Sequence, residues 1–269
     1  MITGASSGIG AATAVACAAA GMRVVISARR VEKLEEVARR CDEAGNTSGG
    51  RAIAVACDVR RDEDVQRLIE RALLETGRLD VAFANAGYGL FGSIAEMTDA
   101  QMRDIFETNY FGTVRLVQAA AKVMRPRKSG HILICSSACS EIGLPMYGAY
   151  AATKAAQDSI GGAMRAELAG EGIAVTTIHP IGTRTAFFEV VEQVSEKRRG
   201  VVGLNTPRHM MHPVEKVAQR IVKCLRRPRP EVWPSVLTRY ALALTTAFPG
   251  LGAWAMRRAM KRRGAAGVQ

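Results

Sequence analysis

Thr3-Gly4-Ala5-Ser6-Ser7-Gly8-Ile9-Gly10 stands near the amino terminus, and a segment of helical length and the apolar run 24–26 follow it. Glycines let a chain turn tightly and let its backbone approach a pyrophosphate, which binds where the first N–H groups of a helix point outward. The spacing Gly-x-x-x-Gly-x-Gly differs from the common Gly-x-Gly-x-x-Gly, and a glycine cluster alone is a weak signal. Between a strand and a helix, however, it predicts a dinucleotide site.

Short apolar runs rich in β-branched residues alternate with segments of helical length as far as residue 180. The strand-like runs are 24–26, 52–55, 81–83, 132–134 and 173–175, and the helical segments are 8–20, 31–44, 62–76, 99–124 and 148–170. Continuous apolar runs are typical of strands buried on both faces of a parallel sheet, and strand–helix alternation predicts right-handed βαβ units. We therefore expect an α/β fold in a single domain, 1–230: a doubly wound parallel sheet with helices on both faces, the Rossmann fold.

Only Met1-Ile2 precede the glycine turn, although such a turn normally follows a buried central strand. Either the first strand is short or the start codon lies upstream, and we favour the second explanation.

The chain has 269 residues and a formal net charge of +12, and a basic protein can bind nucleic acid, anionic lipid or a phosphorylated ligand. It has no zinc-finger spacing, RNA-binding signature or basic stripe interleaved with aromatic residues, so we expect no nucleic-acid partner. The six cysteines form no CxxC pair, and the sequence begins without a signal peptide. These features predict reduced thiols and a cytoplasmic location.

Residues 231–269 form a tail of different composition. The 17 residues 240–256 carry no charge, are interrupted by Pro249-Gly250 and precede the basic cluster 257–263. Three interpretations are open: the tail packs over the pocket or against a second subunit, it makes peripheral membrane contact through residues 235–263, or it spans a bilayer. Its short length and its break favour the first two.

The second strand-like run ends in Ser27-Ala28-Arg29-Arg30. Many dinucleotide folds place an acidic residue here for the adenosine ribose 2′-OH. A carboxylate would repel a 2′-phosphate, whereas a guanidinium binds one with two hydrogen bonds, so Arg29 and Arg30 favour NADP(H) over NAD(H) unless they are solvated surface charges. Asp58, after the third run, is either a hydrogen-bond partner of the adenine or a polar residue that ends a strand.

Tyr150 and Lys154 lie one helical turn apart, and Ser137 lies upstream at the end of a strand-like run. A free tyrosine has a pKa of about 10 and is a poor base at neutral pH. The Lys154 ammonium, on the same face of the helix, favours the phenolate and lowers that pKa. Ser137 can hydrogen-bond a substrate oxygen on which charge develops. Together with the glycine turn, these residues predict one pocket that handles a proton and a hydride.

Over residues 1–225 the sequence resembles the short-chain dehydrogenase/reductase family. The resemblance rests on five motifs in family order: Thr3 to Gly10, Asn85-Ala86-Gly87, Asn109 within Thr108-Asn109-Tyr110-Phe111-Gly112, Ser137, and Tyr150-x-x-x-Lys154. The family spacing places the serine 13 residues before the tyrosine, which selects Ser137 and excludes Ser136 and Tyr147. The resemblance implies an NAD(P)-dependent oxidoreductase acting on CH-OH groups, and a homodimer or tetramer formed through helices 99–124 and 148–170.

The resemblance also implies a role for each motif residue. Tyr150 is expected to be the general acid in reduction and the base in oxidation, while Lys154 lowers its pKa and holds the nicotinamide ribose. Ser137 would polarise the substrate carbonyl, and Asn109 would place a water that links Lys154 to solvent. Asn85-Ala86-Gly87 would pack beside the cofactor. Further contacts with the dinucleotide are expected from Thr3, Gly4, Ser6, Ser7, Gly8, Ile9, Gly10, Val59, Pro180, Thr183 and Thr185.

One position departs from the family pattern. Glycine usually follows Pro180, but here Ile181 does, and its side chain either crowds the nicotinamide or points away. His209 and His212 lie in a predicted loop with no carboxylate partner, and the hydride chemistry of the family needs no metal, so we expect no metal site.

Residues 184–212 correspond to the substrate lid of the family and are largely apolar, with Ala186-Phe187-Phe188 and Met210-Met211 as examples. Methionine side chains adapt to irregular ligands. The segment therefore indicates a lipophilic carbonyl or secondary alcohol as substrate, unless its apolar residues only bury the lid against the body. A non-catalytic dinucleotide-binding protein and a membrane-surface protein of the same fold are the alternatives, and the intact motif residues argue against the first.

Overall fold

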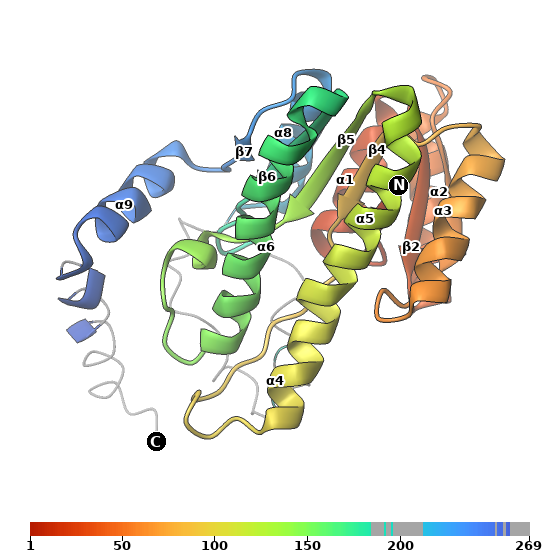
Figure 1. Ribbon diagram of the computed structural model, residues 1–269. Coiled ribbons are helices and arrows are strands. Elements are labelled where there is room, and N and C mark those ends of the chain that lie inside the picture. The colour runs from red at the N-terminus through yellow and green to blue at the C-terminus, as the bar shows by residue number, and fades with distance from the viewer. Residues whose placement is uncertain (184–190, 192–194, 196–211, 251, 255–256, 259–269) are drawn as a thin grey trace.

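The computed structural model describes residues 1–183, 191, 195, 212–250, 252–254 and 257–258. Within these residues, seven parallel strands form a sheet in the order β3-β2-β1-β4-β5-β6-β7 (Figure 1). The strands are β1 Ile2–Thr3, β2 Arg23–Ala28, β3 Arg51–Ala56, β4 Val81–Ala84, β5 Gly130–Cys135, β6 Ile173–Ile178 and β7 Glu231–Val232. The order of the strands reverses between β1 and β4, which is where a doubly wound sheet opens its ligand crevice.

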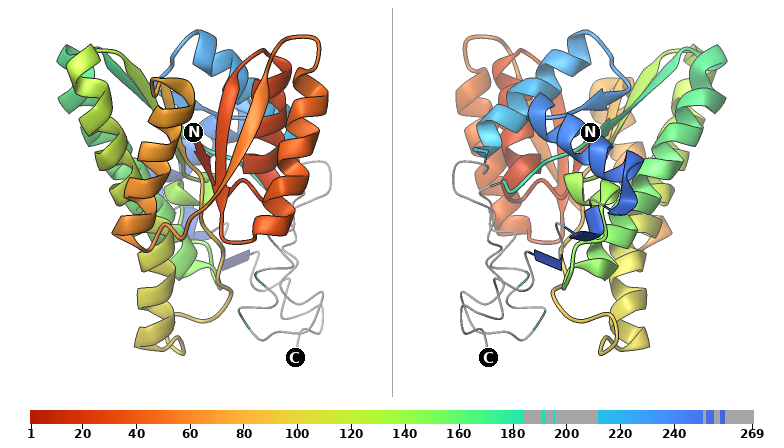
Figure 2. Two further views of the ribbon diagram at one scale, coloured as in Figure 1. Left: turned by 90° about the vertical axis from the view of Figure 1, so that its right-hand side faces the viewer. Right: turned by 90° about the vertical axis from the view of Figure 1, so that its left-hand side faces the viewer.

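Two layers of helices cover the sheet, one on each face (Figure 2). α1 Gly8–Ala19, α2 Val31–Gly45 and α8 Val214–Arg226 cover one face, and α3 Asp62–Thr76, α5 Gly112–Met124 and α6 Gly148–Leu168 cover the other. Leu34, Val37 and Cys41 of α2 recur at helical spacing and are buried, which explains how this helix packs on the sheet. The apolar interior therefore lies in two slabs, separated by the strands.

The strand-like runs of the sequence are all strands, and the Rossmann fold is confirmed. β1 is short, as the two residues before the glycine turn require, but it still pairs Ile2 with Ile26 of β2 and with Phe83 of β4. The chain after β3 and β5 returns to the sheet through the helices that the periodicity predicts.

The prediction of one continuous helix over 99–124 is wrong. α4 Asp99–Phe106 begins at a capping box formed by Thr98 and Gln101, and the π-helix η1 Glu107–Phe111 separates it from α5. A π turn widens the helix locally, and such turns are frequent at functional sites. The apolar spacing of the sequence runs on through the segment, so periodicity does not reveal the change of winding. Among the described residues there are also three short 3₁₀ helices: η2 Arg125–Arg127, η3 Ala138–Glu141 and η4 Ala169–Glu171.

α9 Val236–Ala247 lies beyond β7 at the edge of the molecule (Figure 1). Leu237, Tyr240, Leu244 and Phe248 leave 81%, 64%, 53% and 62% of their surface exposed. Their spacing places them on one side of the helix axis, so this side presents an apolar stripe. In the part of the chain that the structure describes, we find no helix with the length and apolar character needed to cross a membrane.

Candidate active site

A cavity of about 500 Å³ opens at the carboxyl ends of the strands. Seventeen residues predicted from the sequence line it: Gly4, Ser6, Ser7, Gly8, Ile9, Arg29, Arg30, Asp58, Val59, Asn85, Ala86, Gly87, Ser137, Tyr150, Lys154, Pro180 and Thr183. Three other predicted residues are buried and do not line the cavity: Thr3, Gly10 and Asn109. The volume is within the range of ligand pockets, about 300 to 1,000 Å³.

The glycine turn packs against the loop after β4. Gly4 has a φ of +65°, and a Cβ placed on it would lie 2.7 Å from the Cα of Ala86. The Asn85 amide Nδ2 donates to the Thr3 carbonyl at 2.9 Å, and the Thr3 hydroxyl accepts from the backbone N–H of Asn85 at 3.1 Å and of Ala86 at 3.2 Å. A Cβ on Gly10 would lie 2.6 Å from Asn85 Nδ2. The turn therefore has no room for side chains, and this open backbone at the start of α1 fits a dinucleotide pyrophosphate.

Positive charge lies at the β2 end of the cavity. Arg29 and Arg30 are exposed, and Arg30 donates to the hydroxyls of Ser6 at 3.0 Å and Ser7 at 3.2 Å. β2 itself ends at Ala28, so no carboxylate follows the strand. Guanidinium and hydroxyl groups are donors that suit a phosphate.

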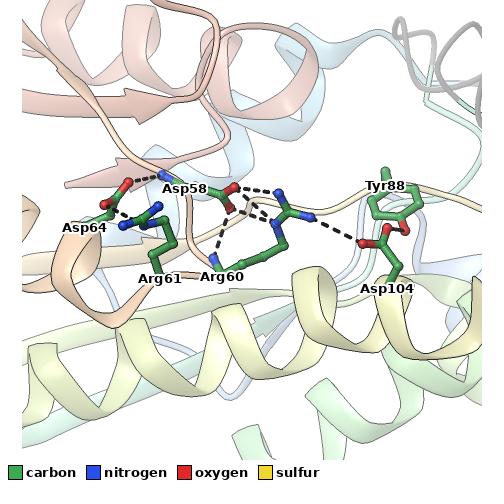
Figure 3. A network of polar contacts seen from close by, with 6 residues as sticks. All are labelled: Asp58, Arg60, Arg61, Asp64, Tyr88 and Asp104. Carbon is green, nitrogen blue, oxygen red and sulfur yellow. Dashed lines mark hydrogen bonds and ion pairs between the residues drawn. The ribbon is translucent and has the colours of Figure 1, made fainter. Parts of the chain in front are cut away.

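Asp58 lies in a network that joins the loops after β3 and β4 to the helices α3 and α4 (Figure 3). Its carboxylate accepts from Arg60 Nη2 at 2.8 Å, Arg60 also reaches Asp104 at 3.3 Å, and Asp104 accepts from the Tyr88 hydroxyl. The backbone N–H of Asp58 donates to Asp64 at 2.9 Å. Burial alone would raise the pKa of Asp58, but the hydrogen bonds and charge of Arg60 outweigh it and lower that pKa. Asp58 is thus an ionised carboxylate on the cavity wall whose charge is balanced by Arg60. Its contact with adenine stays a prediction.

Tyr150 and Lys154 project from α6 into the cavity. The Lys154 ammonium donates to the carbonyl of Cys135 at 2.7 Å, lies 5.6 Å from the centre of the Tyr150 ring, and is only 4% exposed. Burial lowers the pKa of Lys154 and raises the pKa of Tyr150 well above its ordinary value. The prediction that the pKa of Tyr150 is lowered is therefore wrong for the protein without cofactor, because the effect of burial on the phenolate is the larger one. A protonated phenol is the form that a general acid requires.

The two neighbouring serines have different surroundings. The Ser136 hydroxyl donates to the backbone carbonyl of Lys154 at 3.0 Å, so it fastens β5 to α6. The Ser137 hydroxyl accepts from the N–H of Cys139 at 3.1 Å, and its hydrogen bond with Tyr150 acts to lower the tyrosine pKa. Tyr147 is 1% exposed and packs edge-on against Phe91. Ser137 is accordingly the serine that faces the phenol of Tyr150.

Asn109 does not line the cavity. Its side chain is fully buried in η1, where Nδ2 donates to the Tyr88 carbonyl at 2.9 Å and to Thr153 at 3.0 Å, and Oδ1 accepts from the Tyr88 N–H at 2.9 Å. The Asn109 carbonyl accepts from Gln157 Nε2 at 2.7 Å. Gln157 was not predicted from the sequence, where its only signal is a polar residue three positions after Lys154.

The helix that carries Tyr150 is pressed against the sheet farther along its length. A Cβ on Gly161 would lie 2.4 Å from Thr177 Cγ2 of β6. Nearby, His179 Nε2 lies 3.3 Å from Asp158 Oδ1, and its ring stacks on Trp233 with centroids 4.2 Å apart. Burial would raise the pKa of Asp158, but the hydrogen bond and charge of His179 lower it.

The cavity also has lining residues that the sequence analysis did not select: Ala28, Cys57, Tyr88, Thr108, Cys135, Cys139, Leu144 and Gly182. Thr108 lies in the motif around Asn109, and the others belong to none of the five motifs, so only the fold brings them to the cavity. Thr185 and His209 lie outside the described residues, as do most of residues 184–212. Of that segment, Val191 is buried against Phe91 and Tyr147, and the Ser195 hydroxyl accepts from the Phe91 N–H at 2.9 Å.

Comparisons with solved structures agree with this geometry. A short-chain dehydrogenase from Sphingobium yanoikuyae in complex with NADPH superposes with a TM-score of 0.76 at 26% identity, covering 93% of each chain. An alcohol dehydrogenase from the archaeon Thermococcus sibiricus complexed with 5-hydroxy-NADP superposes with a TM-score of 0.73 at 26% identity, covering 86% of this chain and 93% of that one.

Sequence comparisons give the same result. The uncharacterized oxidoreductase Lin0452 of Listeria innocua is 34% identical over 206 residues, which are 76% of this chain and 81% of that protein. The dehydrogenase/reductase SDR family protein 7-like of Drosophila melanogaster is 30% identical over 263 residues, 97% and 80% of the two chains. The family model of the short chain dehydrogenase matches residues 1–196. With this match across most of the chain, the protein belongs to the short-chain dehydrogenase family, oxidoreductases that use a nicotinamide dinucleotide.

Proposed function

We propose that the protein is an NADP(H)-dependent oxidoreductase that interconverts a carbonyl and a secondary alcohol. One observation carries the proposal: Ser137, Tyr150 and Lys154 lie in the same cavity as the glycine turn and the arginines after β2. A proton donor and a dinucleotide cradle in one enclosed space are what carbonyl reduction requires.

The chain supplies the proton and the orientation in this reaction. When bound, the nicotinamide supplies or accepts the hydride. In reduction, Tyr150 gives its phenolic proton to the substrate oxygen, and Ser137 hydrogen-bonds that oxygen as negative charge develops on it. The Lys154 ammonium then stabilises the phenolate that is left, because an opposite charge at short range favours the ionised form. In oxidation the same groups work in reverse.

The test of the reaction is turnover by the wild type and by Tyr150→Phe. Phenylalanine keeps the ring but has no proton to give, so we expect kcat to fall by about 100- to 10,000-fold while NADPH binding stays the same. If Tyr150→Phe and the wild type reduce lipophilic ketones equally fast, the proposed role of the tyrosine is wrong. A wild type that binds NADPH and turns over no carbonyl would support the non-catalytic alternative.

The preference for NADP(H) rests on Arg29, Arg30 and the absence of a carboxylate at Ala28. A charge-assisted hydrogen bond contributes about 1.5 to 3 kcal/mol, so Arg30→Ala should weaken NADPH binding by about 10- to 100-fold. Arg29→Ala should weaken it in the same sense. NADH has no 2′-phosphate, so its affinity should change little. Fluorescence titration of both cofactors measures this, and equal losses for NADPH and NADH would contradict the assignment.

The proposed substrate is lipophilic. Leu144 and Tyr147 line the cavity, and they pack with Phe91, Met146 and the buried Val191. An apolar wall next to Ser137 and Tyr150 favours a substrate whose carbonyl is attached to hydrocarbon. We expect kcat/KM to rise with the length of aliphatic ketones, since each buried CH₂ contributes about 0.8 kcal/mol. Equal values for small hydrophilic and long aliphatic ketones would refute the assignment.

We also propose a homo-oligomer that packs through α5 and α6, as the family resemblance suggests. Phe111, in the π turn that leads into α5, leaves 45% of its surface exposed, which is consistent with a contact there. Sedimentation velocity gives the mass of the wild type, and Phe111→Glu should shift it towards the monomer.

The apolar stripe on α9 supports a second role, peripheral contact with a membrane through residues 235–263. Leu237 and Leu244 face outward on it, and Arg257 and Arg258 follow in the tail, so apolar insertion and attraction to anionic lipid would act together. Co-sedimentation with vesicles of anionic phospholipid should be lost in the double variant Leu237→Glu, Leu244→Glu. Thr246→Glu, on the opposite side of α9, is the matched control. Equal binding by all three proteins would exclude this role.

A further inference from the structure

Gln157 connects the Lys154 ammonium to the π turn that carries Asn109. It lies one helical turn after Lys154 on α6 and is fully buried. Its Oε1 accepts from Lys154 Nζ at 2.8 Å, and its Nε2 donates to the Asn109 carbonyl at 2.7 Å. The resemblance to the family predicts a water in the link between Lys154 and Asn109, but here a side-chain amide makes that link directly.

The orientation of this amide follows from its partners. An ammonium only donates hydrogen bonds, and a backbone carbonyl only accepts them, so the oxygen of Gln157 must face Lys154 and the nitrogen must face Asn109. Gln157 Nε2 also donates to the Thr113 hydroxyl at 2.6 Å, and that hydroxyl donates to the Asn109 carbonyl at 2.8 Å. The network is closed, and a fully satisfied buried network holds its members in one arrangement.

The network leaves Lys154 one free direction. Its ammonium has three N–H donors, of which one reaches the Cys135 carbonyl and one reaches Gln157. Among the described residues, the third N–H of the ammonium is therefore left to point into the cavity, where Tyr150 lies. The titratable groups that face Lys154 are Tyr150 on its own helix, Cys135 at the end of β5 and Cys139 in η3. Burial raises the pKa of both thiols, so neither adds a charge near neutral pH.

A carboxamide can keep a neighbouring proton donor in position by hydrogen bonding, but it does not relay protons. To relay one, Oε1 would have to bind a proton from Lys154 while Nε2 lost one to the Asn109 carbonyl, and neutral amides do neither near pH 7. We propose that Gln157 is a positioning residue for the proposed oxidoreductase reaction: it aims the Lys154 ammonium at Tyr150 and closes the path from Lys154 to Asn109 to proton exchange. The proton that Tyr150 gives up is then replaced through the open side of the cavity.

Two substitutions separate positioning from space filling. Gln157→Leu keeps most of the volume but removes the acceptor, whereas Gln157→Ala leaves room for a water that can take the place of the amide. Loss of a hydrogen bond to a charged group corresponds to about 10- to 100-fold, so we expect kcat to fall by that factor in Gln157→Leu with KM little changed. Gln157→Ala should be less stable than Gln157→Leu and yet more active. If the leucine variant is the more active of the two, Gln157 only fills space and the proposal is wrong.

The pH dependence gives a second criterion. Without its acceptor the ammonium of Lys154 is less stable, and Tyr150 then loses the positive charge that favours its phenolate. The rise of kcat/KM with pH for alcohol oxidation should therefore move to higher pH in Gln157→Leu and stay in place in Gln66→Leu, the same substitution at an exposed position of α3. Coincident profiles for wild type and Gln157→Leu would overturn the inference.

A measurement on the cofactor-free protein keeps this inference distinct from the proposed function. Nitrogen NMR of lysine-labelled protein follows the titration of Lys154, assigned through Lys154→Arg. Gln157→Leu should lower the pH at which Lys154 titrates, and Gln66→Leu should not. An unchanged titration refutes the role of Gln157 even in an active enzyme. A lowered titration in a protein that reduces no carbonyl supports the geometry and refutes only the proposed reaction.

Discussion

Replacing Thr3 with valine tests how the glycine turn is held to the sheet. Thr3 is 1% exposed, and its hydroxyl accepts from the N–H groups of Asn85 and Ala86 at 3.1 and 3.2 Å. Valine has nearly the same volume and the same branched shape but accepts no hydrogen bond. Thr3→Val therefore removes the acceptor of two backbone amides, together with the long hydrogen bond of 3.4 Å that the hydroxyl donates to the Phe83 carbonyl.

The size of the effect follows from the burial of those amides. A buried donor left without a partner costs about 1 to 3 kcal/mol. Asn85 and Ala86 are half-buried at the cavity, where water reaches part of their surface, so the lower end applies and the two together cost about 2 kcal/mol. This lowers the ratio of folded to unfolded protein about 30-fold. In urea the unfolding midpoint should fall at unchanged slope. NADPH should also bind more weakly, because Asn85 and Ala86 line its cavity.

Thr13→Val is the matched control. Thr13 is also 1% exposed, yet its hydroxyl has no hydrogen-bond partner among the residues described. Removing an unpaired buried hydroxyl should be neutral or stabilising. Equal shifts of the urea midpoint in both variants, or a cost of less than about 0.5 kcal/mol for Thr3→Val, would contradict this role of the Thr3 hydroxyl.

Three further predictions concern other parts of the molecule. Gly4→Ala should abolish NADPH binding in titrations, because a Cβ there meets the loop after β4 at 2.7 Å and the φ of +65° disfavours alanine. The pKa of Asp158 is lowered in the folded state by His179. The ion pair therefore contributes its full stability above the ordinary carboxyl pKa of about 4, and this contribution is lost as the pH falls through the lower pKa that Asp158 has in the folded protein. Urea midpoints should therefore fall more steeply with acid in the wild type than in Asp158→Asn, and parallel curves would contradict this. Burial raises the pKa of Cys17 to about 11 and of Cys41 to about 12, so iodoacetamide at pH 8 should label them only after unfolding, as mass spectrometry would show.

The sequence contained enough to predict the sheet. β2, β3, β4, β5 and β6 contain apolar runs bounded by turn residues, which are typical of strands in a parallel sheet. β7, which consists of Glu231 and Val232, has no such run and was not predicted. The contacts between Thr3, Asn85 and Ala86 could not be predicted, because they join loops about 80 residues apart and depend on the order of β1 and β4. Local pattern carries no information on such pairings.

The candidate site divides in the same way. Tyr150, Lys154 and Ser137 were identified because their chemistry recurs at a fixed spacing. The pKa of Tyr150 was predicted in the wrong direction for the isolated chain, because a sequence shows the neighbouring charge but not the burial that outweighs it. Gln157 was missed for a related reason: a glutamine in a helix is usually solvated, and only the packing of α6 against η1 places it between a cation and a carbonyl.

The absence of a side chain at Gly161 has a consequence for the proposed proton transfer at Tyr150. A helix advances about 1.5 Å per residue, so Gly161 lies about 16 Å along α6 from Tyr150 and about 10 Å from Lys154. Because α6 is one continuous helix, the close approach to Thr177 that Gly161 permits also constrains where the part of the helix that carries Tyr150 can lie. A larger residue at position 161 would push α6 away from β6 and so turn the phenol of Tyr150, near the amino-terminal end of the helix, away from Ser137. In the proposed reaction, the alignment of Tyr150 with Ser137 thus depends on two features remote from the cavity: the methyl group of Thr177 and the absence of a side chain at Gly161.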